Sequence, residues 1–195
     1  MAQETLTQTW RAHFFRNLEH SKAGKFLKAA AVEGKLGDWT SALTSAVVET
    51  CTAMGWRSAA KGFPGSVLPH RQSEYLAIDV FAFDESTARW PFPVAVFELE
   101  NTISDDRVGY SLWKVLCVRA QGRFVFAYHR DASQGTALVD RLTDSFIGSL
   151  SIADRLAIRG ETTLIIGNRG GSETFPYGYF KAWTLNTNTG QFDRV

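Results

Sequence analysis

The chain has little cysteine, methionine or proline, and it carries almost no net charge. Its two cysteines, Cys51 and Cys117, each stand in an apolar helical pattern, which predicts buried free thiols rather than a disulfide framework. A net charge of +1 excludes a global electrostatic attraction to nucleic acid or to anionic membranes. Any contact with nucleic acid must therefore come from a local basic patch, and a homodimer with a basic cleft remains compatible with this balance.

Long apolar runs and targeting signals are also absent. No stretch approaches the roughly 18 apolar residues that mark a membrane-spanning helix. The opening residues, Met-Ala-Gln-Glu-Thr, lack the basic region and apolar core of a signal peptide. We therefore expect a cytoplasmic protein without a membrane partner.

The composition is that of an ordinary globular protein. Hydrophobic residues make up 45% and charged residues 21% of the 195 positions, which excludes a disordered chain. The length suits one domain over residues 1–195, and the 14 phenylalanines and 6 tryptophans predict a well-filled interior.

Hydrophobic periodicity predicts the order of helices and strands. Helices are expected at about 4–20, 21–36, 39–54, 104–120 and 135–150. Strands are expected at about 56–60, 76–83, 94–100, 124–128, 162–167 and 177–185, with a last short strand after the turn at 188–190. In the third helix, Asp38 is the expected N-cap and Gly55 the expected end. This order predicts an α/β protein with a mixed β-sheet and helices on its faces.

Acidic residues interrupt two of the predicted buried strands. Alternation along the strand at 94–100 places Glu98 and Glu100 on one face at its C-terminal end. Asp79 stands within the preceding apolar strand. Buried carboxylates are costly without compensation, so three of them on two neighbouring strands indicate a bound cation, and a metal ion is the preferred candidate.

The arrangement resembles the PD-(D/E)xK nuclease superfamily, which has the restriction-endonuclease-like fold. The resemblance covers about residues 39–129, with 1–37 as an N-terminal helical extension and 130–195 as an additional C-terminal helix and strands. Asp79 corresponds to the metal-binding aspartate, and Glu98-Leu99-Glu100 stands where members carry (D/E)-x-K. Glu49 lies in the first core helix, where many members carry an acid. The chain departs from the pattern because it lacks the preceding proline and has Glu100 in place of the lysine.

The resemblance implies an αβββαβ core and a Mg²⁺-dependent endonuclease that hydrolyses nucleic-acid phosphodiester bonds, with Mn²⁺ as a substitute and DNA as the first expected partner. Asp79, Glu98 and the main-chain carbonyl of Leu99 would bind the metal, whose hard charge prefers oxygen ligands. Glu100 would act as a further ligand or as general base, and Glu49 would hold a water ligand.

A lysine from another element can replace the missing motif lysine. On the helix expected at 104–120, Arg107, Ser111, Lys114 and Gln121 fall in one polar stripe. In the superfamily this helix often contributes a polar or basic residue, so Lys114 is the expected cation and Gln121 the next candidate. The competing interpretation is that the stripe is simply the solvated face of the helix.

Each acid also has a structural interpretation. Asp79 can cap a loop or pair with a buried arginine, Glu100 can emerge into solvent, and Glu49 can be an ordinary helix-edge residue. Two other functions therefore stay open. One is a catalytically inactive member of the fold that binds nucleic acid or protein, and the other is an unrelated α/β interaction protein.

Overall fold

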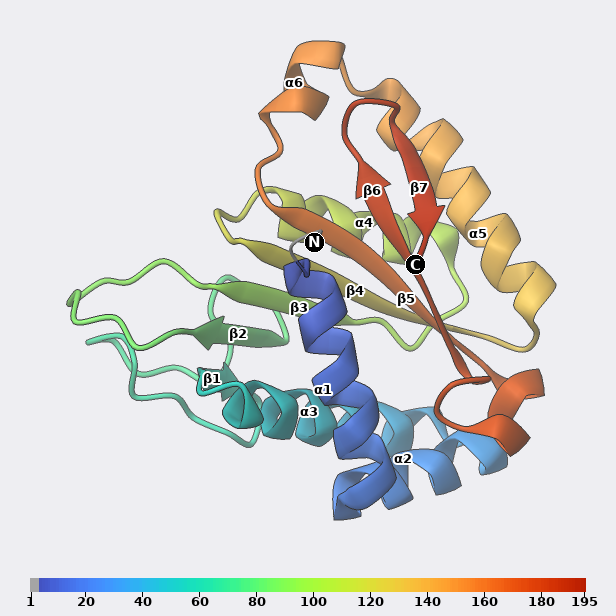
Figure 1. Cartoon of the computed structure of the whole chain (residues 1–195), viewed down its shortest axis with the longest axis horizontal. Coiled ribbons are helices and arrows are strands. Elements are labelled where there is room, and N and C mark those ends of the chain that lie inside the picture. The colour runs from blue at the N-terminus through green and yellow to red at the C-terminus, as the bar shows by residue number, and fades with distance from the viewer. Residues whose placement is uncertain (1–3) are drawn as a thin grey trace.

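A seven-stranded mixed β-sheet forms the centre of the molecule (Figure 1). The computed structural model describes residues 4–195 apart from the side chain of Leu36, so residues 1–3 of the predicted N-terminal extension lie outside the described residues. The strands are β1 (Arg57–Ala60), β2 (Val80–Phe83), β3 (Ala95–Leu99), β4 (Gly122–His129), β5 (Glu161–Asn168), β6 (Phe180–Asn186) and β7 (Gln191–Arg194).

The spatial order of the strands is the same as their order in the chain, from β1 to β7. The central pairs β3–β4 and β4–β5 are parallel, whereas the two pairs on either side of them are antiparallel. Parallel neighbours need a crossover connection, and helices supply it between β3 and β4 and between β4 and β5. The structure thus confirms the predicted α/β class with a mixed sheet.

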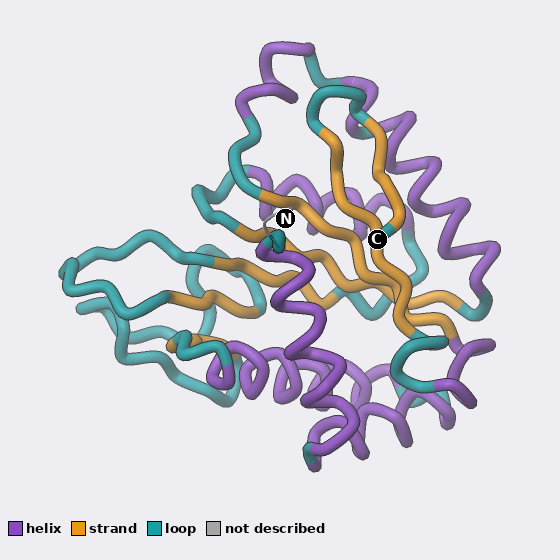
Figure 2. The backbone as a smooth tube through the Cα atoms, in the orientation of Figure 1, coloured by secondary structure: helices purple, strands orange, loops and turns teal. Residues whose placement is uncertain are grey.

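Helices cover both faces of this sheet (Figure 2). They are α1 (Leu6–His20), α2 (Lys22–Glu33), α3 (Leu36–Ala53), α4 (Asp105–Leu116), α5 (Ala132–Ser145) and α6 (Ile152–Ala157), with 3₁₀ turns at Ile147–Ser149 and Arg169–Thr174. Trp10, Trp39 and Phe97 belong to the core between the sheet and α1–α3. Leu112 and Leu138 belong to the second core, between the sheet and α4–α5. No helix within residues 4–195 has the length and apolar character needed to cross a bilayer.

The start of α1 shows how local sequence fixes a helix to the sheet. Thr5 and Gln8 form a capping box, in which each side chain accepts a hydrogen bond from the backbone of the other. The next two N–H groups, of Leu6 and Thr7, donate to the carboxylate of Glu161 at 2.9 and 2.7 Å. A negative charge at a helix N-terminus is favourable, so Glu161, the first residue of β5, anchors the start of α1 to the sheet.

Several predicted boundaries need correction. The helix expected from Trp39 begins at Leu36, so Asp38 lies in its first turn and Lys35 takes the N-cap position. The helix expected to reach Ala120 ends at Leu116. Arg123 binds carbonyls at this end: its side chain donates to Val115 in the last turn of the helix and to Val118 just beyond it. These contacts satisfy carbonyls that a longer helix would have used itself.

The strand expected at 76–83 contains only Val80–Phe83. Leu76 and Ala77 each have a φ of 53°, in the left-handed region that no strand can accommodate. Asp79 therefore precedes the strand instead of standing inside it. The prediction that both thiols are buried is correct for Cys51 but wrong for Cys117, which is exposed at the end of α4.

Candidate functional site

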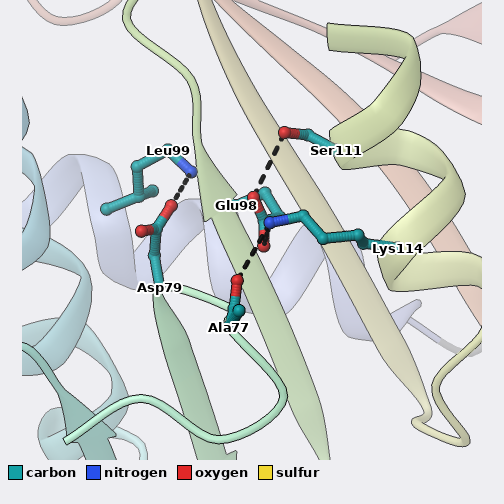
Figure 3. A network of polar contacts seen from close by, with 6 residues as sticks. All are labelled: Ala77, Asp79, Glu98, Leu99, Ser111 and Lys114. Atoms are coloured by element: carbon teal, nitrogen blue, oxygen red, sulfur yellow. Dashed lines mark hydrogen bonds and ion pairs between the residues drawn. The ribbon is translucent and has the colours of Figure 1, made fainter. Parts of the chain in front are cut away.

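Asp79, Glu98 and Lys114 come together beside the C-terminal end of β3 (Figure 3). In the antiparallel β2–β3 pair, Val80 lies opposite Phe97, which brings the preceding Asp79 next to Glu98. Helix α4 lies across this face of the sheet and extends Lys114 towards the same point. Two acids from neighbouring chain segments thus share one cation from a helix.

Glu98 is the buried centre of this cluster, with only 3% of its surface exposed. Its Oε1 lies 2.7 Å from the Nζ atom of Lys114, and its Oε2 accepts a hydrogen bond from the Ser111 hydroxyl at 3.1 Å. Desolvation by burial raises the pKa of Glu98 to about 7; the Lys114 hydrogen bond opposes this rise and the Asp79 charge adds to it. Glu98 is therefore a carboxylate that one ammonium group only partly compensates.

Asp79 is half-buried and points towards the end of β3. Its Oδ2 accepts the backbone N–H of Leu99 at 2.7 Å, while its Oδ1 has no hydrogen-bond partner among the described residues. Burial raises the pKa of Asp79, the Leu99 N–H and Lys114 oppose this rise, and the charges of Glu74 and Glu100 add to it. One oxygen of this carboxylate is thus positioned by backbone, and the other is available to a ligand.

Lys114 connects three segments of the chain. Besides pairing with Glu98, its Nζ donates to the carbonyl of Ala77 at 2.9 Å and lies 5.4 Å from the ring centroid of Tyr110. The Ala77 carbonyl belongs to the turn with left-handed backbone conformation that leads into Asp79. The ammonium group therefore holds β3, α4 and this turn in a fixed relation.

The structure leaves two of the predicted acids at the margin. Glu100 is half-buried, and its Oε1 accepts the N–H of Thr102 at 3.1 Å, so one oxygen serves the turn that leaves the strand. Glu49 is exposed on α3, which packs on the opposite face of the sheet from α4. Within residues 4–195, Glu49 makes no hydrogen bond or ion pair with the cluster.

Gln121, the second candidate to take the place of the motif lysine, does not reach the cluster. Because α4 ends at Leu116, Gln121 lies in the connection to β4, where its N–H donates to the Val94 carbonyl. Val94 precedes β3, so Gln121 lies at the opposite end of that strand from Glu98. Of the two candidates, only Lys114 contacts an acid of the site.

The donor set suits a magnesium ion better than a transition metal. The backbone N–H and C=O of one strand residue point to the same edge, so the Leu99 carbonyl faces the side on which its N–H meets Asp79. Asp79 Oδ1, Glu98 and this carbonyl offer oxygen atoms alone, and Mg²⁺ completes such partial sets with water. In the part of the chain that the structure describes, no three His, Cys, Asp or Glu side chains are grouped as metal ligands. A metal here would therefore rest on two carboxylates.

Sequence reasoning missed two contacts of the cluster. Ser111 shares the polar stripe of Lys114, and its position one turn before Lys114 was a usable signal for the bond to Glu98. The Ala77 carbonyl had no signal, because neither Leu76 nor Ala77 is a residue type that favours a left-handed backbone. Comparisons with protein-family models, curated proteins and solved structures find no match to this chain.

Proposed function

We propose that the protein is a Mg²⁺-dependent nuclease of the PD-(D/E)xK type, in which Lys114 replaces the lysine of the motif. The observation that carries this proposal is the 2.7 Å contact between Lys114 and Glu98 beside Asp79. An ammonium group thus reaches the acidic pair from α4, whereas the strand position that usually carries the lysine holds Glu100.

The topology supports the same proposal. The segment from α3 to β4 runs helix, three strands, helix, strand. Its strand pairs β1–β2 and β2–β3 are antiparallel and β3–β4 is parallel. This is the αβββαβ order expected from the resemblance, with Asp79 before β2 and Glu98 near the end of β3. Fold alone does not define function, so the side-chain cluster carries the argument.

In phosphodiester hydrolysis, each residue of the cluster would have a separate role. Asp79, Glu98 and the Leu99 carbonyl would hold Mg²⁺, which when bound supplies Lewis-acid polarisation of the phosphate and lowers the pKa of a bound water. Lys114 would place a fixed positive charge next to the phosphate oxygens, where negative charge develops. Ser111 and the Leu99 N–H keep the two carboxylates in position. Water oxygen forms the new bond to phosphorus as the bond to the leaving oxygen breaks.

A catalytically inactive binding protein is the second candidate. It is favoured by the hydrogen bond from Lys114 to Ala77, because the same ammonium group satisfies Glu98 and the turn without a metal. In this case the cluster would be a structural connection between α4 and the sheet.

Cleavage of labelled single-stranded and double-stranded DNA with Mg²⁺, Mn²⁺ or EDTA tests the nuclease proposal. We expect metal-dependent cleavage that Asp79→Ala or Glu98→Ala reduces by about 100-fold or more, because each removes a metal ligand. Lys114→Met should lose a comparable factor, since a single charge-stabilising donor contributes about 10²–10³ in rate.

Glu85→Ala is the matched control, because it removes an exposed acid from the loop after β2 without touching the cluster. It should cleave like the wild type. Equal cleavage by the wild type and by Asp79→Ala would contradict the assignment of the site. Absence of cleavage of DNA and RNA with either metal would favour the inactive binding protein.

A further inference from the structure

We infer that the exposed side of α4 binds an unpaired nucleobase next to the cluster, so that the substrate is a single-stranded nucleic acid. This inference rests on the proposed function and narrows its substrate class. The observation behind it is a pair of stacked aromatic side chains, Tyr110 and Trp113, one helical turn apart and next to Lys114.

The two rings are exposed although they are large and mostly apolar. Tyr110 is 58% and Trp113 51% exposed, and their ring centroids lie 5.9 Å apart with planes inclined by 19°. The rings are stacked on each other, and no further aromatic ring among the described residues stacks on this pair. Aromatic side chains that stack on bases are the usual way of binding single strands without reading their sequence.

Lys114 connects this surface to the cluster. Its Nζ lies 2.7 Å from Glu98 and 5.4 Å from the centroid of the Tyr110 ring. A phosphate held at the cluster would therefore have the aromatic surface as its neighbour. Arg107 is exposed on the same line of the helix as Lys114, two turns away, and pairs with no acid among residues 4–195. Lys114 and Arg107 can contact phosphates of the nucleic-acid backbone while the adjacent rings stack on its bases.

A hollow continues from the aromatic pair towards α5. It measures about 660 Å³, which is within the usual size of a small-molecule site, and Leu142 and Phe146 contribute apolar lining. Asp105, Asp106 and Asp144 also line it, together with Arg141, which is paired with Asp105. The negative charge of Asp106 and Asp144 is left without a cation in this lining and disfavours phosphates there, so the backbone is directed to the Lys114 side and a base to the hollow.

This geometry favours a single strand over a duplex. In a duplex each base is covered on both faces by its neighbours in the stack, so exposed rings gain nothing from it. An unpaired base has a free face for Tyr110 or Trp113. The other conceivable occupant is a second copy of the chain, and the test below separates the two.

Binding of a short labelled oligonucleotide by the full chain, followed by fluorescence anisotropy in EDTA, tests this inference without cleavage. Tyr110→Ala and Trp113→Ala should each weaken single-strand binding by about tenfold, since one base–aromatic contact contributes that much. Tyr110→Phe should bind like the wild type because it keeps the ring. A duplex of the same sequence should show no difference between these proteins.

Trp90→Ala is the matched control, because Trp90 is 61% exposed in the loop between β2 and β3, at the opposite end of β3 from Glu98. It should leave single-strand binding unchanged. Unaltered binding in Tyr110→Ala and Trp113→Ala, or no single-strand binding by the wild type, would overturn the inference. Loss of a wild-type dimer in these variants, without any oligonucleotide binding, would assign the surface to self-association instead.

The two proposals fail separately. If Asp79→Ala abolishes cleavage but the aromatic variants bind normally, the nuclease stands and the base-binding surface does not. If the aromatic variants lose single-strand binding while no protein cleaves, the surface stands and the nuclease function does not.

Discussion

Glu98 is the residue on which the site depends, because it is a nearly buried acid with two hydrogen-bonding or ionic partners. Lys114 and Ser111 both approach it from α4. Even so, burial raises its pKa to about 7, so in the absence of metal the native state binds a proton more tightly than the unfolded chain does. The free energy of unfolding must then depend on pH.

The sign of this dependence follows from the raised pKa. Stability from Glu98 is fully present below its unfolded value of 4.5 and is lost as the pH rises to about 7. At about 1.4 kcal/mol per pH unit, the loss is about 3 kcal/mol. Urea unfolding in EDTA should therefore show Glu98→Gln gaining about this much relative to the wild type between pH 4.5 and 7.

Glu85→Gln serves as the control for this measurement and should follow the wild type at every pH. Burial lowers the pKa of His129, which has the opposite effect on the pH dependence of stability, but His129 is present in all three proteins and cancels in the difference. A constant difference between Glu98→Gln and the wild type across this range would contradict the proposed cause.

Asp79, Glu98 and Lys114 could be recognised in the sequence because each stands at a defined position in a periodic pattern of apolar and polar residues. An acid within an apolar run of the sequence and a lysine on a defined helical stripe can be recognised without coordinates. Glu49 shows the limit of this reasoning. Its position in the chain matched the family pattern. Which face of the sheet its helix covers, however, depends on how the helices pack, and the sequence does not show this.

At the scale of elements, the turn before β2 determines where Asp79 stands. Leu76 and Ala77 have left-handed backbone conformations that are unfavourable for residues with a side chain, and the Ala77 carbonyl accepts from Lys114. The apolar run from Leu76 to Phe83 predicted a longer strand, because sequence alone cannot show such a turn. Strain of this kind is common beside functional sites.

Ala77→Gly should stabilise the protein, which is the reverse of the usual effect of such a change. A left-handed residue with a side chain costs about 1–2 kcal/mol, and glycine avoids this at an entropic cost of about 0.4–1 kcal/mol in the unfolded chain. We expect the free energy of unfolding to rise by about 0.5–1 kcal/mol in a denaturant titration. Ala88→Gly, at an exposed loop residue without a positive φ, should instead be neutral or destabilising. Equal effects of the two changes would contradict strain at Ala77.

At the scale of the whole molecule, one ammonium group opposes the buried carboxylate of Glu98 and the half-buried carboxylate of Asp79, so a divalent cation should stabilise the fold. A ligand at 100 times its dissociation constant adds about 2.7 kcal/mol to the free energy of unfolding. For a chain of this length that corresponds to roughly 5–10 °C in Tm. Thermal unfolding should show a rise in Tm with Mg²⁺ or Mn²⁺ for the wild type but not for Asp79→Asn.

Glu85→Gln should keep the full rise, since its carboxylate lies in an exposed loop. An equal rise in Asp79→Asn would place the bound cation elsewhere on the molecule. No rise in the wild type at high metal concentration would favour the second candidate function, in which the cluster is a structural connection.

The agreement between spatial and sequential strand order has a consequence for how the chain folds. Each strand after β1 pairs with the strand that leaves the ribosome just before it, so none of these strands must wait for a later segment before its first pairing. The sheet can therefore grow in one direction during translation, with each newly made strand adding to the open edge. Glu98 and Lys114 would already be in contact range before the last three strands exist.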